Sequence, residues 1–334
     1  MVAFLEADGN PRPEHAPLKS PSAFSRFLNQ YNWNARAIIR AVRTAVTAQI
    51  WDSYAKRKGR RPILEIMLDL TTLEKTGKFP NLEIHQLKDK IGLHLVVLYV
   101  ILGAQRFPWA FAIWRGKDTA SPSMLALRLL TCIPAFWSER FTVRVLADSG
   151  FDSDEFIDGV NDLGLHGVIG SRANRLIGPG KHLSDLCCKG SRVQFKACET
   201  PVFASWYRLK RARKEIEWRY VISTRAAEGE TIRRWGRRRW RIEAFFKTMK
   251  FRFGLNQFGQ RTTRGAFRFL ILGFLAFMLA FWQALEMVTD WGYLDWGAVA
   301  QAAADNLLLD VQLLVAVREV ERLKAISVAR GIAC

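Results

Sequence analysis

The chain has 334 residues, 49% of them hydrophobic, and carries 50 Lys and Arg against 31 Asp and Glu, a formal net charge of +19. This length and apolar content are typical of a folded protein with one large core or two modest ones, and exclude a disordered tail. The positive charge calls for a polyanionic partner, with nucleic acid as the first candidate and an anionic membrane surface as the second.

Residues 1–60 are predicted to be helical and basic. Ser and Asn helix starts precede apolar residues at helical spacing, and a run of Lys and Arg closes the segment. A small DNA-contacting unit and a solvated pair of helices both fit this pattern. No signal peptide is expected at the N-terminus. The five cysteines include no CxxC pair, which favours structural thiols in a reducing compartment.

Residues 61–172 are predicted to form the first part of an α/β core. Runs rich in Val, Ile and aromatic residues predict strands. Segments with apolar residues at helical spacing lie between the later strands and predict helices. In chain order the expected elements are a strand ending at Asp69, strands over 92–102 and 108–116, a helix over 121–137, a strand ending at Asp148, a helix over 152–165 and a strand over 166–172. This succession fits a mixed sheet covered by helices.

Residues 173–228 are expected to be a β-rich insertion. Its basic alternation faces either DNA or solvent, and comprises Arg208, Lys210, Arg211, Arg213 and Lys214. Residues 229–290 are expected to be the second part of the core, with one long helix from Thr231 to Gly254 and an apolar helix from about Arg264.

The apolar helix raises the question of a membrane span. Its uninterrupted apolar run, Phe269–Trp282, is 14 residues long, and a span needs about 20. We therefore expect a buried core helix and no membrane partner. Residues 291–334 are expected to form two amphipathic helices, which either mediate a dimer contact or cover the core.

The long helix carries one acid in a strongly basic segment. From Arg233 to Arg268 there are twelve Lys and Arg, and Glu243 is the single carboxylate. Pairing with Arg239 and Lys247 at four-residue spacing explains Glu243 if it is taken alone. Asp69 and Asp148 are each expected at the C-terminal end of a strand, where open α/β sheets bind ligands. Either aspartate alone is explained by a turn or a helix cap.

Taken together, the three carboxylates suit a metal site. Mg²⁺ prefers carboxylate oxygens, with water and phosphate completing its shell. Two such ions about 4 Å apart stabilise the attacking and leaving oxygens of an in-line phosphoryl displacement. The surrounding Arg and Lys suit a phosphodiester backbone. The pattern predicts that Asp69, Asp148 and Glu243 hold metal within a DNA-binding groove.

The sequence resembles the insertion-sequence transposases of the DDE type. Three segments carry the likeness: "IMLDLTTLEK", "VRVLADSGFDS" and "RRWRIEAFFKTMK". The last resembles the signature of tyrosine, two residues, arginine, three residues, glutamate, six residues and lysine. Arg239, Glu243 and Lys250 match it, whereas Gly236 occupies the place of the tyrosine. The likeness extends from about residue 60 to 285.

The resemblance implies an RNase H-like mixed sheet flanked by helices, interrupted by the β-rich insertion and extended by helices at both ends. It implies a catalytic and metal-binding set of Asp69, Asp148 and Glu243, with two Mg²⁺ ions for which Mn²⁺ can substitute. Arg239 and Lys250 are then expected to contact DNA phosphates. Lys247 and Lys75 are further candidates for DNA contact, and Lys78 is a weaker one.

The implied activity is cut-and-paste transposition, in which the enzyme nicks the ends of the element and transfers the freed 3′-hydroxyl to target DNA. The implied partners are double-stranded DNA, as terminal inverted repeats and target, and a second copy of the chain in a homodimer. The implied location is the bacterial cytoplasm, at the nucleoid. Two alternatives stay open: a degenerate or domesticated relative that binds DNA without transposing it, and a basic DNA- or membrane-binding protein with structural acids.

Several neighbouring residues are expected to have structural roles. Four acids near a helix start suit the helix dipole: Asp152, Asp154, Glu155 and Asp158. Glu65 shares the strand parity of Asp69, and we expect it at the surface or at an edge. His94 and His166 are expected to be packed or hydrogen-bonded.

Overall fold

The computed structural model describes residues 1–12, 14, 19–54, 59–75, 77, 79, 81–210, 216–287 and 294–329. The chain divides into two compact units. One contains residues 36–247, and the other contains residues 1–35 together with 248–334.

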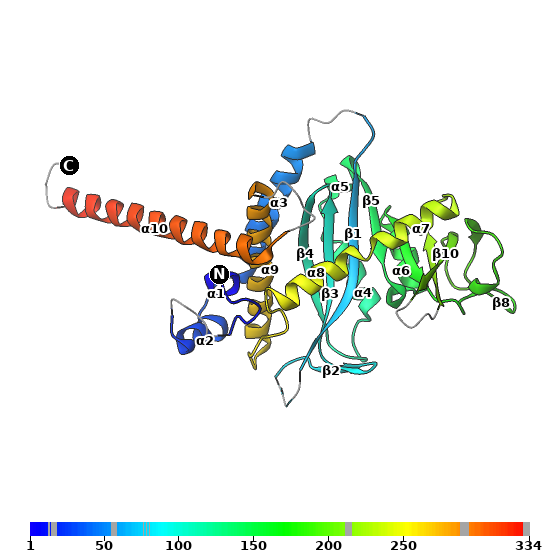
Figure 1. Ribbon diagram of the computed structural model, residues 1–334, viewed down its shortest axis with the longest axis horizontal. Helices are drawn as coiled ribbons and strands as arrows, with labels where there is room; N and C mark the ends of the chain where they lie inside the picture. The colour runs from blue at the N-terminus through cyan, green and yellow to red at the C-terminus, as the bar shows by residue number, and fades with distance from the viewer. Residues whose placement is uncertain are drawn as a thin grey trace. The chain divides into compact units, whose positions relative to one another are not determined.

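The first unit is built around a mixed sheet (Figure 1). Its strands are β1 (Ile63–Glu74), β2 (His85–Leu87), β3 (Lys90–Leu102), β4 (Gln105–Trp114), β5 (Thr142–Ala147), β6 (His166–Ser171), β9 (Ser191–Val193), β10 (Val202–Lys210) and β11 (Ile216–Ser223). The strand order is β2-β3-β1-β5-β6-β11-β10-β9, with β4 also paired to β3. β1 is antiparallel to β3 and parallel to β5, and β5 is parallel to β6. Each strand predicted for residues 61–172 is present.

The first strand is longer than predicted, so the expectation that it ends at Asp69 is wrong. β1 continues to Glu74 because β3 pairs with it along the whole stretch from Glu65 to Glu74. β5 pairs with β1 only as far as Ala147, which is opposite Leu68. Asp69 is therefore the first residue of β1 beyond the shorter parallel neighbour.

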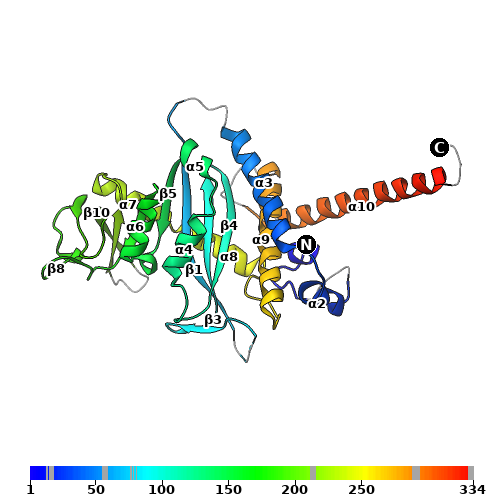
Figure 2. The same ribbon diagram turned by 180° about the vertical axis from the view of Figure 1, so that it is seen from behind.

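Helices cover both faces of the sheet. α7 (Gly229–Arg238) and the first turns of α8 (Arg241–Phe251) cross one face, and α4 (Pro122–Leu130) and α6 (Asp154–Asp162) lie over the other (Figures 1 and 2). On α8, the ring of Phe245 stacks on Tyr99 of β3 with centroids 4.3 Å apart. An apolar side of the helix that carries Glu243 thus packs on the sheet.

Two predicted single helices are each divided in the structure. The helix expected over 121–137 is α4 followed by α5 (Ala135–Arg140), because Pro134 cannot lie inside a helix and instead caps the second one. The helix expected from Thr231 to Gly254 is α7 followed by α8. At the junction the backbone changes to tighter bonds three residues apart, from Arg239 N to Gly236 O and from Trp240 N to Arg237 O.

The segment between the second aspartate and the glutamate is β-rich, as expected. β9, β10 and β11 extend the main sheet beyond β6, and β7 (Leu176–Gly178) with β8 (Lys181–His182) forms a separate small ribbon. The chain therefore has the predicted α/β class: a mixed central sheet flanked by helices, with helical segments towards both termini.

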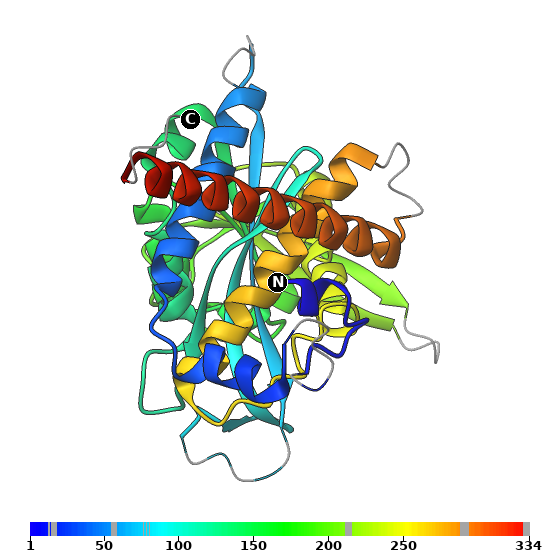
Figure 3. The ribbon, with the colours of Figure 1, turned by 90° about the vertical axis from the view of Figure 1, so that its left-hand side faces the viewer.

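The second unit is helical. It contains α1 (Val2–Leu5), α2 (Pro21–Asn29), α9 (Thr263–Met287) and α10 (Trp296–Ala329), whereas α3 (Ala35–Tyr54) lies almost entirely in the first unit. α1 and α2 both pack on α9, and α10 crosses α9 and also contacts α1 (Figure 3). Phe4 of α1 packs against Phe269 of α9 with ring centroids 4.9 Å apart. The apolar helix α9 is thus a core helix.

Both α9 and α10 are long and apolar enough to pass a test for membrane spans. In its most apolar window α9 is 78% buried by protein, whereas α10 is 22% buried. The expectation of two helices over 291–334 is wrong, because α10 is continuous and its sequence contains neither Pro nor Gly from Ala298 to Ala329. Its exposed apolar side chains include Leu309, Leu313, Val320 and Leu323.

Candidate active site

The parallel pairing of β1 with β5 brings the predicted aspartates to the same level of the sheet. Leu68 of β1 is opposite Ala147 of β5, so Asp69 and Asp148 follow these partners at the same level of the sheet. After β5 the chain turns into a short 3₁₀ helix, Ser149–Phe151, which Asp148 caps. The Gly150 N–H donates to Asp148 Oδ1 at 2.8 Å, which fixes that carboxylate at the sheet edge.

Glu243 is linked to Asp69 through the side chain of Arg239. Glu243 lies in the first turn of α8, and its side chain is 45% exposed. Arg239 Nη2 donates to Glu243 Oε1 at 3.1 Å, and Arg239 Nη1 lies 3.4 Å from Asp69 Oδ2. One guanidinium therefore joins the carboxylate of the sheet to the carboxylate of the helix.

The three carboxylates form one electrostatic group. Burial raises the pKa of Asp69 to about 7, and the negative charges of Asp148 and Glu243 act in the same direction. The cation of Arg239 and the N–H of Leu70 oppose this rise in the pKa but do not cancel it. Asp69 thus holds its proton to a higher pH than a free aspartate does, and an added positive charge would favour its ionised form.

The donors at this edge are carboxylate oxygens, which suit a hard divalent cation. Within the described residues, however, no three His, Cys, Asp or Glu side chains lie close enough to hold one metal ion. Arg239 takes two of the three carboxylates as ion-pair partners. The carboxylate oxygens are thus of the type that binds a divalent metal, and in this structure Arg239 pairs with two of the three carboxylates.

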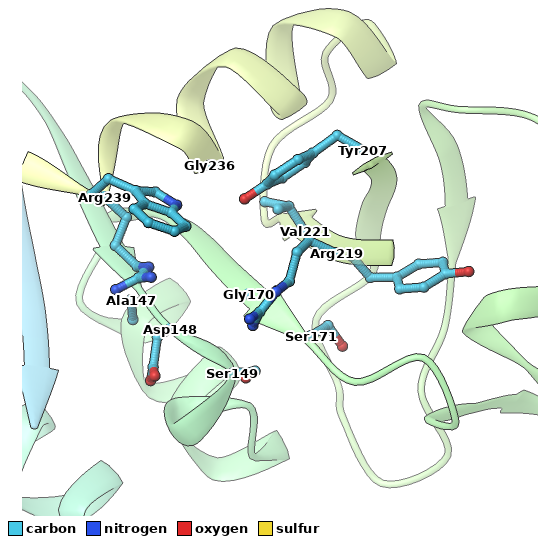
Figure 4. A pocket seen from close by; sticks show the side chains of 12 residues that line it. Ala147, Asp148, Ser149, Gly170, Ser171, Tyr207, Arg219, Val221, Gly236 and Arg239 are labelled. Carbon is cyan, nitrogen blue, oxygen red and sulfur yellow. The ribbon is translucent and has the colours of Figure 1, made fainter. Parts of the chain in front are cut away.

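A small pocket of about 60 Å³ opens beside Asp148 (Figure 4). Its lining comes from six elements and includes Asp148, Gly170, Tyr207, Arg219, Gly236, Arg239 and Trp240. In Figure 4 the Tyr207 hydroxyl and the Arg219 guanidinium extend into the pocket, and the Arg239 guanidinium points towards Asp148. A carboxylate, two arginines and two aromatic groups thus face one space, a suitable environment for a phosphate and an attached ring.

Tyr207 and Arg219 were not predicted as site residues. They lie on β10 and β11, within the segment expected to be an insertion, and no spacing relates them to the three carboxylates. They reach the pocket because β11 pairs with β6, which follows β5 in the sheet. Only the sheet order connects them to Asp148.

Gly236 lies against the sheet and has no space for a larger side chain. A Cβ atom at this position would lie 2.7 Å from Cγ2 and 2.8 Å from Cγ1 of Val221. Of the two tryptophans nearby in sequence, Trp240 lines the pocket. Trp235 instead packs against Arg144 and His166.

The structure places the predicted DNA-binding lysines at different points. Lys247 is exposed on α8, and Lys250 lies in the last turn of α8, in the part of that helix assigned to the second unit. Lys75 directly follows β1, six residues beyond Asp69, or about 20 Å at the rise of a strand. Lys78 and three residues of the basic alternation, Arg211, Arg213 and Lys214, lie outside the described residues.

The neighbouring acids have structural partners, as expected. Asp152 accepts from the Ser171 hydroxyl at 2.8 Å and pairs with Arg175. Asp158 accepts from the backbone N–H groups of Glu199 and Thr200 at 3.0 and 2.8 Å. These acids hold the loops around β6 and do not belong to the carboxylate group.

The two histidines that border strands, His94 and His166, are hydrogen-bonded, as expected. The cysteines within the described residues form no disulfide. His94 contacts the Thr72 hydroxyl at 2.9 Å and His166 contacts the Ser223 hydroxyl at 2.9 Å. The free cysteines are Cys132, Cys187, Cys188 and Cys198.

The expectation that Glu65 lies at the surface or at an edge is wrong. This residue is 3% exposed, and three arginines surround its carboxylate.

Comparison with known proteins gives one family. The family model described as "Transposase DDE domain" matches residues 90–279, more than half of the chain. The matched segment includes Asp148, Arg239 and Glu243 and begins after Asp69. No curated protein sequence matches the chain.

Among solved structures, the chain is similar to one described as "Cryo-EM structure of piggyBac transposase synaptic complex with hairpin DNA". The two are 11% identical with a TM-score of 0.48, and the match covers 91% of this chain and 69% of that chain. At this identity and TM-score the likeness does not bear on function.

Proposed function

Because this chain belongs to the transposases with a DDE domain, we propose that it binds the ends of an insertion sequence and catalyses metal-dependent cleavage and strand transfer of DNA. The observation that carries the proposal is the group of Asp69, Asp148 and Glu243, whose mutual repulsion contributes to the raised pKa of Asp69. Acids that served only to stabilise the fold would not need to be held together in one electrostatic group.

We assign the metal to the same three carboxylates. Mg²⁺, or Mn²⁺ in its place, supplies charge that stabilises the attacking and leaving oxygens of a phosphodiester. Asp69 and Asp148 would hold the ion from the sheet, and Glu243 would complete the set from α8. For Glu243 to do so, its ion pair with Arg239 must open, which frees the guanidinium for a DNA phosphate.

The pocket beside Asp148, at about 60 Å³, is suited to hold a single phosphate of the DNA next to the scissile one. Arg219 and Arg239 supply positive charge, and Trp240 supplies an aromatic surface. We propose that the phenol of Tyr207 takes the role that the family resemblance gives to a tyrosine at position 236. Lys247, Lys250 and Lys75 are proposed to contact the DNA backbone further from the reacting phosphate.

The proposed partners are double-stranded DNA, as terminal inverted repeats and target, and a second copy of the chain. A homodimer provides one catalytic group for each of the two ends of an element. The proposed place of action is the bacterial cytoplasm, at the nucleoid. The net charge of +19 supports binding to DNA over a wide surface.

The test is cleavage of a labelled duplex that carries the DNA flanking the gene. Reactions contain Mg²⁺ or EDTA with wild type, Glu243→Gln or the matched control Glu230→Gln, an exposed glutamate of α7 that pairs with Arg233. The expected result is metal-dependent release of a 3′-hydroxyl end by wild type and Glu230→Gln, and loss of cleavage with retained DNA binding in Glu243→Gln.

A second candidate, a copy that binds DNA without transposing it, is favoured by two observations. Gly236 stands where the signature has tyrosine, and Arg239 pairs with two of the carboxylates. Specific binding of the flanking duplex with no cleavage by wild type in Mg²⁺ or Mn²⁺ would establish this candidate and contradict the first.

A further inference from the structure

Glu65 is a buried carboxylate that the proposed chemistry does not use. It lies on β1 four residues before Asp69, so both side chains are on the same face of the sheet. The Glu65 side chain is 4% exposed. It pairs with Arg144 at 3.5 Å, with Arg238 at 2.7 Å and with Arg241 at 3.1 Å.

Two of these partners define the junction between α7 and α8. Arg238 is the last residue of α7 and Arg241 is the first residue of α8. Arg238 contacts Oε1 of Glu65 and Arg241 contacts Oε2, so one carboxylate holds both helix ends on the sheet. Buried ion pairs with several hydrogen bonds fix one geometry more firmly than exposed pairs do.

The third partner connects this contact to the sheet and to α7. Arg144 on β5 is the register partner of Glu65, and its side chain is 4% exposed. Its guanidinium lies 4.1 Å from the ring centroid of Trp235 on α7. The Trp235 ring also forms a T-shaped contact with His166, which is hydrogen-bonded to Ser223. Glu65 thus lies within a packed group that spans four strands and two helices.

The residues between the two anchored arginines are those of the site. Arg239 and Trp240 form the junction itself, and Glu243 follows Arg241 by two residues. Arg239 reaches Asp69, and Arg239 and Trp240 line the pocket beside Asp148. A shift of the junction would therefore move Arg239, Trp240 and Glu243 together relative to the two aspartates.

We infer that Glu65 is a positioning residue, which anchors the α7–α8 junction through Arg238 and Arg241 and thereby sets Glu243 and Arg239 against Asp69. The effect of Glu65 on catalysis rests on the proposed function, whereas its anchoring of the helix junction is independent of that function. Glu65 is not a fourth metal ligand, because both of its oxygens accept from arginines and four residues of strand separate it from Asp69 by about 13 Å.

The first test is the Mg²⁺ concentration that gives half-maximal DNA cleavage. Glu65→Gln keeps the shape of the side chain and removes its charge. The matched control is Glu74→Gln on the same strand, where Glu74 pairs with Lys90 and is 64% exposed. Loss of an outer-shell support typically weakens metal binding about 10- to 100-fold, so we expect a shift of that size in Glu65→Gln and none in Glu74→Gln. A residue that only stabilises the fold would lower the active fraction without moving this concentration.

The second test reads the anchoring without requiring activity. Amide hydrogen exchange across residues 236–246 is expected to be faster in Glu65→Gln than in wild type or Glu74→Gln, with other helices of the first unit unchanged. Exchange at wild-type rates across the junction, or an unshifted Mg²⁺ dependence in an active Glu65→Gln enzyme, would overturn the inference.

The two failures are distinguishable. If wild type cleaves no DNA in any divalent metal, the proposed function fails and hydrogen exchange alone decides the role of Glu65. If Glu65→Gln does not fold, Arg241→Gln replaces it in both measurements, because the Arg241 side chain is 43% exposed and is the link to α8. Arg241→Gln is then expected to accelerate exchange at the start of α8 and to raise the half-maximal Mg²⁺ concentration, and wild-type values for both would contradict the inference.

Discussion

At the scale of single residues, Asp69 shows how position changes the chemistry of a carboxyl group. Its pKa rises from 3.8 to about 7 because the group is buried and because Asp148 and Glu243 are negative. Between about pH 4 and pH 7 the folded state therefore holds a proton that the unfolded state has lost. The stability that Asp69 contributes is fully present below about pH 4 and is lost as the pH rises through about 7.

This shift predicts the pH dependence of Asp69→Asn. In EDTA, the variant should gain stability relative to wild type as the pH rises from 5 to 8, by up to about 3 kcal/mol, because about two units of the pKa shift lie within this range. Chemical denaturation at both pH values measures the difference. A difference between the variant and wild type that is the same at pH 5 and at pH 8 would show that the pKa of Asp69 is not raised.

The pocket gives a second prediction at this scale. Gly236→Tyr should not increase DNA cleavage, because its Cβ would overlap Val221, and overpacking of this kind costs about 1–3 kcal/mol. Tyr207→Phe should lower DNA cleavage with little change in melting temperature. Tyr31→Phe, at an exposed site on the other unit, should change neither the cleavage nor the melting temperature. Higher activity in Gly236→Tyr than in wild type would contradict the role given to Tyr207.

At the scale of elements, helix ends decide where the site residues point. The sequence around Glu243 has the period of one helix, yet the structure has two, and the break lies at Arg239 and Trp240. A continuous helix would place Gly236, Arg239 and Glu243 along one face. The break instead turns Gly236 towards Val221 and leaves Arg239 free to reach Asp69.

The start of α4 offers an independent test of a helix end. Ser121 caps this helix by accepting the Met124 N–H at 3.1 Å, and Pro122 follows at the first helical position. Ser121→Ala should lower the free energy of unfolding by about 1 kcal/mol, and Ser121→Asp should retain most of it. Urea unfolding of the three proteins checks this, and equal losses in both variants would argue against the cap.

At the scale of the whole molecule, charge determines the partner more than any single contact does. The chain has 19 more basic than acidic residues, and few of the basic ones are buried. Binding to DNA then depends on the release of counterions from the phosphates, which makes the affinity steeply dependent on salt. The affinity for an acidic protein partner would fall less steeply with salt concentration, because such a partner lacks the condensed counterions of a duplex.

The salt dependence is therefore a direct prediction. If 6–10 phosphates are contacted, the affinity for a duplex should fall about 10³- to 10⁵-fold between 50 and 200 mM salt. Lys247→Gln should reduce the slope by about one contact, and Lys117→Gln, at an exposed turn after β4, should leave it unchanged. Fluorescence anisotropy over this range measures both slopes. A flat dependence in wild type would contradict binding through the DNA backbone.

The sequence by itself determined the order of strands and helices in the core, because alternation and apolar runs reflect burial locally. It also singled out Asp69, Asp148 and Glu243 as candidates for the site, since an acid after an apolar run or in a basic helix is visible without coordinates. Only the tertiary structure decided that β1 runs past Asp69, that Glu65 is buried under three arginines and that Tyr207 and Arg219 enter the pocket. Those facts depend on which segments pack together, and strand pairing joins residues that no local pattern connects, such as Asp69 with Val97 and Tyr220 with Ser171.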